Sequence, residues 1–225
     1  MGKIDLIPHH ATRNIEENKT VLIQINMTYP VLTGEVDGAE RDVNLCFAKL
    51  AENLVESTQA SMLQEARAAA KILPEALPYQ IDLTFTSTWS DHGIVSFFTD
   101  LYLYAGGLRG ITYRYGTVQR LRDNGPLFVT ALFPPDADIS EFVTNFVASA
   151  QKKAQRLDDT QAQHIRAMAH SYYTSENIYL TDLGLAVFYQ PHTLSPGVAG
   201  IPVFTIPYSD KGPYPPERLV LPERP

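Results

Sequence analysis

Cysteine and basic side chains are both scarce in this chain of 225 residues. The single cysteine, Cys46, cannot form an internal disulfide and cannot supply a cysteine-based zinc site. The 18 lysines and arginines stand against 25 aspartates and glutamates, which gives a formal net charge of −7. Because phosphate backbones and anionic lipid bind basic surfaces, this balance excludes nucleic acid as a partner and predicts no membrane contact within the chain.

Long apolar runs are also missing. No stretch comes near the roughly 20 consecutive apolar residues that a membrane-spanning helix needs. The first residues, Met-Gly-Lys-Ile-Asp, lack the basic-then-apolar layout of a signal peptide. Composition therefore leaves two expectations open: a cytoplasmic protein, or a chain that begins after an export signal or membrane anchor was removed. The hydrophobic fraction of 44% and the charged fraction of 19% are typical of a globular protein.

Motifs for catalysis are absent from the sequence as well. His164 and His170 are too far apart for one helical face, and no His-Glu-x-x-His sequence occurs. No serine lies in a Gly-x-Ser-x-Gly elbow. The segment Gly106-Gly107-Leu-Arg-Gly110 lacks the Gly-Lys-Ser/Thr ending of a phosphate loop, which favours a tight turn between strands. We expect a protein without catalytic, cofactor-binding or metal-binding residues; residues that form an active site only in the fold are the alternative.

Hydrophobic periodicity divides the chain into two α+β halves. Residues 1–19 are polar and are expected to form a loosely held lead-in. Residues 20–120 are expected to hold a strand, a long helix with one apolar stripe, and three strands in an antiparallel meander. The strands are predicted at Thr20–Tyr29, 81–86, Ile94–Tyr104 and Ile111–Arg120, the helix at about Ala39–Leu73, and its stripe at Val43, Phe47, Leu50, Leu54, Met62 and Ala66.

Residues 121–210 are expected to form the second half, packed with the first as one unit. A helix begins after Asp138, whose spacing to Glu141 resembles a capping box. A shorter helix and three strands follow, and the prolines of the last strand place it at a sheet edge. The expected ranges are Ile139–Leu157, Thr160–Ser171, Ile178–Leu180, Leu185–Gln190 and Val203–Tyr208. Residues 211–225 are expected to be an extended proline-rich tail. The predicted fold class is α+β, with antiparallel sheet(s) packed against a long N-terminal helix and two further helices.

Three sets of segments resemble a known family. The first is a strand ending in Tyr-Pro, followed by a helix that carries Asn44; the second is an aromatic strand that runs into a Gly-Gly turn. The third, the most specific, is a turn, strand, loop and Ile-Pro-Tyr terminus. In order, the sets occupy residues 25–34, 94–97 with 102–107, and 183–192 with 199–202 and 206–209. Over about residues 20–210 the chain resembles the RsiV/PdaC-like family: ectodomains of lysozyme-sensing anti-sigma factors, the non-catalytic domain of some peptidoglycan deacetylases, and related domains of unknown function.

The resemblance implies a mixed α+β fold similar to a subdomain of the actin/Hsp70 ATPases, without their nucleotide site. It further implies a non-enzymatic, extracytoplasmic binding or sensor domain of the bacterial cell envelope, with a lysozyme-like protein as partner. The loop 194–200 lacks the aromatic residue common in the family, and His192 stands where a tyrosine is common. The alternative function is a glycan- or peptidoglycan-binding accessory module of a cell-wall-processing protein.

Loops and tyrosines are the candidate partner-binding features. Loops on a rigid sheet commonly carry contacts, which indicates residues 191–200 and 105–110. Alternation places Tyr102 with Tyr104, and Tyr113 with Tyr115, so four rings are expected on one face if the two strands pair. Such rings suit sugars and protein interfaces, whereas the alternative is that they cover the sheet beneath the long helix. The expected binding residues are Tyr102, Tyr104, Arg109, Tyr113, Arg114, His192, Ser195, Pro196 and Gly197.

Overall fold

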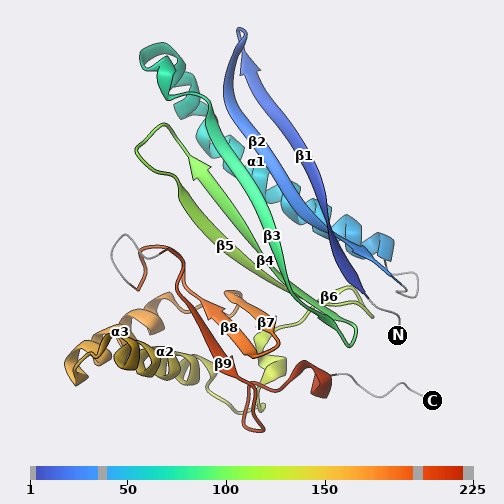
Figure 1. The fold of residues 1–225 in the computed structure, drawn as a ribbon, viewed down its shortest axis with the longest axis vertical. Coiled ribbons are helices and arrows are strands. Elements are labelled where there is room, and N and C mark those ends of the chain that lie inside the picture. Colours follow the sequence, from blue (N-terminus) through green and yellow to red (C-terminus); the bar gives the residue numbers. More distant parts are fainter. Residues whose placement is uncertain (1–3, 35–39, 195–199, 220–225) are drawn as a thin grey trace. The chain divides into compact units, whose positions relative to one another are not determined.

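A computed structural model describes residues 4–34, 40–194 and 200–219 (Figure 1). Contacts between residues divide the chain into two compact units. Unit 1 comprises Met1–Thr86 and Thr99–Tyr113, and unit 2 comprises Ser87–Phe98 and Arg114–Pro225. This division differs from the expected boundary near residue 120, because three long strands each contribute residues to both units.

Six strands form one sheet in the order β1-β2-β3-β4-β5-β6. Their bounds are Asp5–Glu17, Thr20–Thr33, Tyr79–Asp91, Ile94–Tyr104, Ile111–Arg120 and Gly125–Pro126. β1 and β2 are antiparallel, whereas β2 and β3 are parallel. A parallel pair needs a crossover connection, which here consists of helix α1 (Glu40–Ile72) and the short 3-10 helix η1 (Pro74–Ala76). The predicted α+β class is confirmed, and the sheet is mixed instead of purely antiparallel.

The segment expected to be a loose lead-in forms β1, an edge strand of this sheet. Its pairing with β2 runs from Asp5 opposite Thr33 to Glu17 opposite Thr20, with an irregularity between Ile15 and Glu16. Ala11 and Ile15 pack against the core, while most of the other side of the strand is exposed. The prediction was wrong because a strand with one solvated side can be largely polar and still bury alternate positions.

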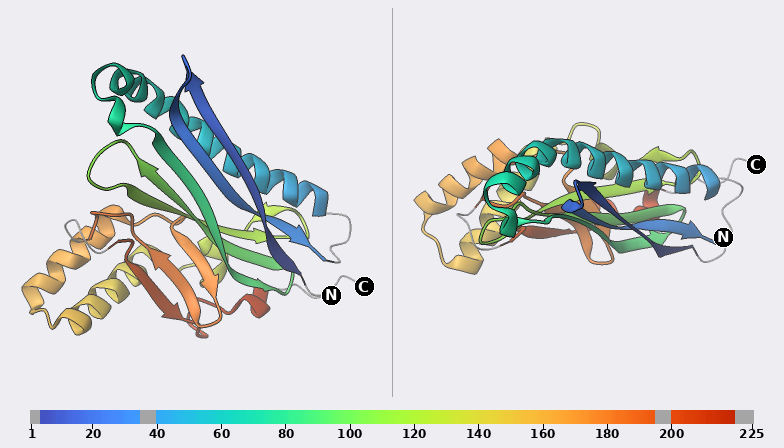
Figure 2. Two further views of the ribbon diagram at one scale, coloured as in Figure 1. Left: turned by 45° about the horizontal axis from the view of Figure 1, so that its top comes forward. Right: turned by 90° about the horizontal axis from the view of Figure 1, so that it is seen from above.

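Helix α1 lies along one face of the unit 1 strands (Figure 2). The predicted helix is confirmed, and most of its predicted stripe is buried, namely Val43, Phe47, Met62 and Ala66. Leu50 is instead 50% exposed, and Ala51 and Val55 are buried. From Phe47, steps of four residues stay on the face that contacts the sheet, whereas a step of three to Leu50 turns toward solvent at this position.

Two side-chain amides each bind both backbone polar groups of one strand residue. In unit 1, Asn44 Oδ1 accepts a hydrogen bond from Leu32 N at 2.6 Å, and Asn44 Nδ2 donates to Leu32 O at 3.0 Å. In unit 2, Gln190 Oε1 accepts from Arg114 N at 3.1 Å, and Gln190 Nε2 donates to Arg114 O at 2.6 Å. Each amide therefore satisfies a donor and an acceptor of the main chain at once, as a neighbouring strand would.

Unit 2 contains helices α2 (Ile139–Gln155) and α3 (Asp159–Tyr172) and a second sheet in the order β7-β8-β9. The strands are β7 (Ile178–Thr181), β8 (Gly184–Phe188) and β9 (Val203–Pro207), and two 3-10 helices are η2 (Val129–Leu132) and η3 (Pro216–Leu219). β9 lies at an edge, as its prolines predict. All five residues of β8 are buried, so this strand is the centre of the unit 2 core.

The extended tail expected at residues 211–225 is wrong for residues 211–219, which pack within unit 2, while residues 220–225 lie outside the described residues. Pro213 and Pro216 are buried, and Tyr214 N donates to Leu132 O at 2.7 Å. Proline cannot donate to a strand ladder, but its ring is apolar and can be buried without one. The prolines correctly indicated that residues 209–219 form no regular strand. The inference that this segment does not pack against the core was wrong.

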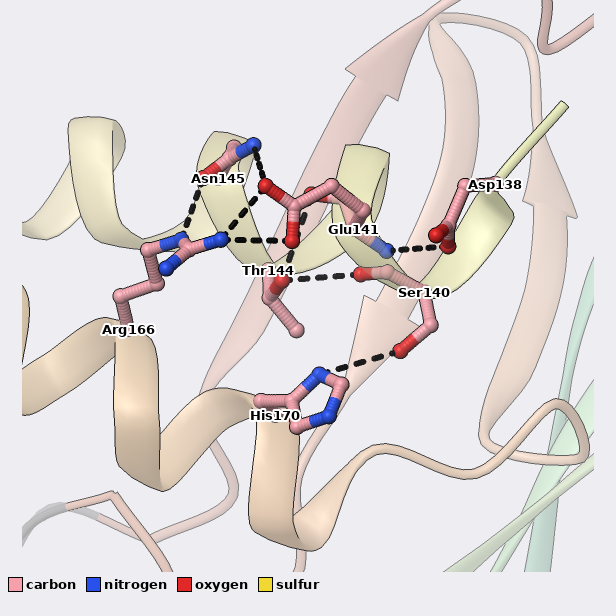
Figure 3. A network of polar contacts seen from close by, with 7 residues as sticks. All are labelled: Asp138, Ser140, Glu141, Thr144, Asn145, Arg166 and His170. Carbon is pink, nitrogen blue, oxygen red and sulfur yellow. Dashed lines mark hydrogen bonds and ion pairs between the residues drawn. The ribbon is translucent and has the colours of Figure 1, made fainter.

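A polar network joins α2 and α3 (Figure 3). Asp138 caps α2 by accepting from Glu141 N at 2.9 Å, as its spacing predicts. Arg166 of α3 donates to both carboxylate oxygens of Glu141, at 2.5 and 2.6 Å, and to Asn145 Oδ1 at 2.6 Å. These hydrogen bonds, that from Arg166 first, hold the pKa of Glu141 below its ordinary value. The network attaches α3 to α2, and we interpret it as a structural contact.

We expect Asn44→Ala to lower the free energy of unfolding by about 1–3 kcal/mol, because two backbone groups of the buried Leu32 lose their partner. Urea unfolding of the variant and the wild type measures the difference. Asn53→Ala, on an exposed position of the same helix, is the matched control. Equal losses in the two variants would contradict the role assigned to Asn44.

The lowered pKa of Glu141 makes the α2–α3 contact dependent on pH. A carboxyl with a lowered folded-state pKa stabilises the fold above its unfolded-state pKa, and this contribution is lost as pH falls through the folded-state pKa. Between about pH 6 and about pH 3, the wild type should therefore lose more stability than Glu141→Gln. Urea unfolding at a series of pH values tests this, and parallel profiles would show that the carboxylate contributes nothing.

Candidate functional site

Strand alternation gives unit 1 a second sheet face, opposite α1. The buried positions of β2 and β3, such as Ile25 and Ile81, lie toward the helix. Successive side chains of a strand point to opposite sides, so the residues that alternate with this core lie on the other face. None of these is buried over the six positions Gln24, Asn26, Thr28, Gln80, Asp82 and Thr84. We call this surface the open face. On β1 to β4 it consists of His10, Thr12, Asn14, Gln24, Asn26, Thr28, Gln80, Asp82, Thr84, Asp100, Tyr102 and Tyr104.

The strand register aligns these polar side chains in rows. One row runs from Asn14 through Gln24 to Gln80, and the next from Thr12 through Asn26 to Asp82. Within the second row, Asn26 Nδ2 donates to Asp82 Oδ1 at 2.7 Å. On the third row, His10 Nδ1 lies 3.0 Å from Thr28 Oγ1. The open face thus presents amide, hydroxyl and carboxyl groups, and two pairs of them, Asn26 with Asp82 and His10 with Thr28, are in contact across adjacent strands.

The ring of Tyr102 lies against the backbone of Gly110. A Cβ atom at Gly110 would lie 2.3 Å from Tyr102 Cζ and 2.5 Å from Leu103 O, so only glycine leaves room for the ring. At the other end of the same loop, Gly106 has φ 74°, and a Cβ there would lie 2.7 Å from Ala76 Cβ. Residues 105–110 are therefore a tight connection between β4 and β5, as the sequence predicts, and Gly110 leaves the space that the ring of Tyr102 occupies.

The structure separates the four tyrosines that were expected to share a face. Because the Cβ direction of Gly110 points at Tyr102, the even-numbered positions at the start of β5 lie on the open face. Tyr113 and, by the same alternation, Tyr115 lie on the opposite face. The prediction was wrong because it assumed a common face without knowing the offset between the two strands.

Among the other predicted binding residues, Arg109 is exposed in the loop 105–110. Arg114 belongs to unit 2, where its guanidinium carbon lies 3.6 Å from the centre of the Phe98 ring. Phe98 in turn contacts the ring of Tyr179, so Arg114 contributes to packing within the unit. His192, also in unit 2, is exposed with φ 67°. Ser195, Pro196 and Gly197 lie outside the described residues.

Tyr102 and Tyr104 are among the residues predicted from the sequence, whereas the polar rows on β2 and β3 are not. The signal was present, since Gln24, Asn26 and Thr28 alternate with apolar residues, as do Gln80, Asp82 and Thr84. However, Asn26 and Asp82 are 56 residues apart in the chain, and only the parallel pairing through α1 brings them together. No local pattern specifies that pairing.

Elsewhere, the described residues contain few groups that could bind a ligand or catalyse a reaction. A hollow of about 460 Å³ near the end of α2 and the start of α3 is lined by Gln155, Leu157, Thr160, Gln161, His164 and Ile165, of which one is ionisable. Among residues 4–34, 40–194 and 200–219, no three His, Cys, Asp or Glu side chains are grouped to hold a metal ion. None of the helices described is long and apolar enough to cross a membrane.

Two tyrosines of unit 2, Tyr173 and Tyr189, have buried hydroxyl groups. Burial raises the pKa of Tyr173 to about 12 and raises that of Tyr189 as well. Both hydroxyls therefore stay protonated near neutral pH, where neither can act as a base. Within the described part of the chain, neither hydroxyl has a hydrogen-bond partner.

Two protein families match this chain, each over a different segment. Residues 16–112 match the family described as Deacetylase PdaC, and residues 130–209 match the family described as Protein of unknown function (DUF3298). The second match falls within unit 2. No curated protein matches the chain.

Solved structures show the same fold over nearly the whole chain. A DUF3298 family member from Bacteroides fragilis is 17% identical, with a TM-score of 0.64, and the match covers 92% of this chain and 90% of that chain. A DUF3298 family protein from Pseudomonas aeruginosa PAO1 is 17% identical, with a TM-score of 0.58, and the match covers 91% and 89%. With the PdaC match over residues 16–112 and the DUF3298 match over residues 130–209, the resemblance to the RsiV/PdaC-like family that the sequence predicts is confirmed.

Proposed function

We propose that the protein is an extracytoplasmic, non-catalytic binding domain of a cell-wall-related protein, and that it binds glycan through the open face. The observation that carries this proposal is the combination of aligned polar rows with the fixed ring of Tyr102. Sugars have hydroxyl groups that pair with amide and carboxyl side chains, and apolar faces that stack on aromatic rings. The match to the PdaC family supports the cell-wall context.

The arrangement of the open face is suited to binding because it is ordered before a ligand arrives. Asn26 and Asp82 hold each other, and the two residues lie on central strands that α1 covers from behind. Side chains that are already fixed lose little conformational freedom when a ligand binds, which favours affinity. A sugar chain profits from this order in particular, because its hydroxyl groups repeat along the chain as the polar side chains repeat along the sheet.

The formal net charge of −7 favours a second candidate, capture of a basic protein such as lysozyme. Opposite charges accelerate the encounter of two proteins and make it sensitive to salt. The loops 105–110 and 191–200, with Arg109 and His192, are the contacts that this candidate predicts. Calorimetric titration of the protein with lysozyme and with soluble peptidoglycan fragments separates the two candidates.

Tyr102→Ala should weaken binding of peptidoglycan fragments about 2- to 10-fold, since an aromatic stacking contact contributes ~0.5–1.5 kcal/mol. Tyr172→Ala is the matched control, because Tyr172 is a tyrosine of α3 that is 51% exposed. Calorimetry or intrinsic fluorescence titration measures both affinities. If the two variants bind alike, or if wild type binds lysozyme and no glycan, the open face is not the glycan site.

Gly110→Ala should weaken glycan binding as well, although it leaves every side chain of the open face in the sequence. The added Cβ would lie 2.3 Å from Tyr102 Cζ and must displace the ring. In Gly107→Ala the nearest atom to the added Cβ is 3.9 Å away, so that variant should bind as wild type does. Thermal unfolding of both variants shows whether they remain folded. Unchanged affinity in folded Gly110→Ala would argue against a fixed ring as part of the site.

A further inference from the structure

The polar rows of the open face run across the strands of unit 1. In one row, Thr12, Asn26 and Asp82 are register partners on β1, β2 and β3. A second row, which begins at Asn14 of β1, crosses the same three strands. Each row therefore places one polar side chain on each strand that it crosses.

The spacing within a row differs from the spacing along a strand. Neighbouring strands lie about 4.8 Å apart, whereas two residues on the same face of one strand lie about 6.7 Å apart. The distance between strands is close to the advance of one sugar in an extended β-1,4-linked chain, and the distance along a strand is not. A chain laid across the sheet can thus keep each sugar over one strand, whereas a chain laid along a strand falls out of step with the side chains.

The two ends of the rows differ in chemistry. The sheet order places β4 next to β3, and Tyr102 lies on the open face of β4 because its neighbour Leu101 belongs to the core on the α1 side. At the other end, Thr12 and Asn14 of the edge strand β1 are exposed. The rows therefore extend from an aromatic ring on β4 to polar side chains at the border of the sheet.

The middle of the row keeps groups that a ligand can use. Asn26 Nδ2 donates to Asp82 Oδ1 at 2.7 Å, which orients both side chains. An asparagine amide has two donor hydrogens and an acceptor oxygen, and a carboxylate has two acceptor oxygens, so one shared hydrogen bond does not exhaust either group. Asn26 and Asp82 can hold each other and still bind hydroxyl groups of a sugar.

We propose that the open face binds an extended, unbranched glycan that crosses the strands, with one sugar over each strand from β4 to β1. This inference rests on the proposed function of the same face. One sugar stacks on Tyr102, and the next sugars hydrogen-bond to the polar side chains of β3, β2 and β1 in turn. Four sugars fill the face, so a longer chain gains no further contact, and a curved or branched chain leaves the strands after its first sugars.

The test titrates soluble chitin oligosaccharides of two, three, four and six sugars calorimetrically into the full chain. Affinity should rise about two- to tenfold with each sugar up to four, the size expected for one added hydrogen bond, and then stay level to six. The double variant Thr12→Ala/Asn14→Ala removes the β1 ends of both rows and should abolish the gain between three and four sugars. Asn53→Ala/Thr160→Ala makes the same replacements at exposed helix positions and should keep that gain.

The possible results have distinct meanings. Wild-type affinity that is independent of length beyond two sugars, or an unchanged gain in folded Thr12→Ala/Asn14→Ala, overturns the crossing arrangement and leaves glycan binding in place. A length dependence that Tyr104→Ala removes and the β1 variant does not would place the chain along β4. Failure of folded wild type to bind any length overturns the proposed function together with this inference. Thermal unfolding shows which variants are folded, and if the β1 variant is not, the wild-type length series decides by itself.

Discussion

The parallel pairing of β2 with β3 is the constraint on which the rest of unit 1 depends. Because parallel neighbours cannot be joined by a short turn, the chain must cross over through α1, and the helix then covers one face of the strands. Alternation turns the residues between the buried ones away from the helix, and at Gln24, Asn26 and Thr28 of β2 these residues are polar. The same pairing aligns Asn26 with Asp82, so the fold and the candidate binding surface have one origin.

The two units use their strands differently. In unit 2 the central strand β8 is buried along its whole length, and a Cβ at Gly116 would lie 1.9 Å from Ile178 O, so backbones approach as closely as glycine allows. Strands that are buried on both faces contribute to stability and have no surface to offer a ligand. In unit 1 the residues that alternate with the core of β2 and β3, namely Gln24, Asn26, Thr28, Gln80, Asp82 and Thr84, are not buried. This contrast is the structural reason for seeking the binding surface in unit 1.

The sequence predicted the local elements well and the long-range pairing poorly. The bounds of β4 and β5, the helix from residue 40 to 72 and the cap at Asp138 follow from periodicity and short-range chemistry, which act within a few residues. β1 was missed because its polar side dominates its composition, and the open face was missed because its rows join residues far apart in the chain. The offset between β4 and β5, which separates Tyr102 from Tyr113, depends on the loop between them and is not encoded in the alternation of either strand.

The edge position of β1 has a consequence for the behaviour of the protein at high concentration. A long strand at the border of a sheet exposes a row of main-chain donors and acceptors, which is a template for fibril-like stacking of one molecule on another. Pro8 removes one donor from this row, and the irregularity between Ile15 and Glu16 bends its far end. The polar side chains of β1, from which a loosely held lead-in was predicted, thereby also oppose self-aggregation.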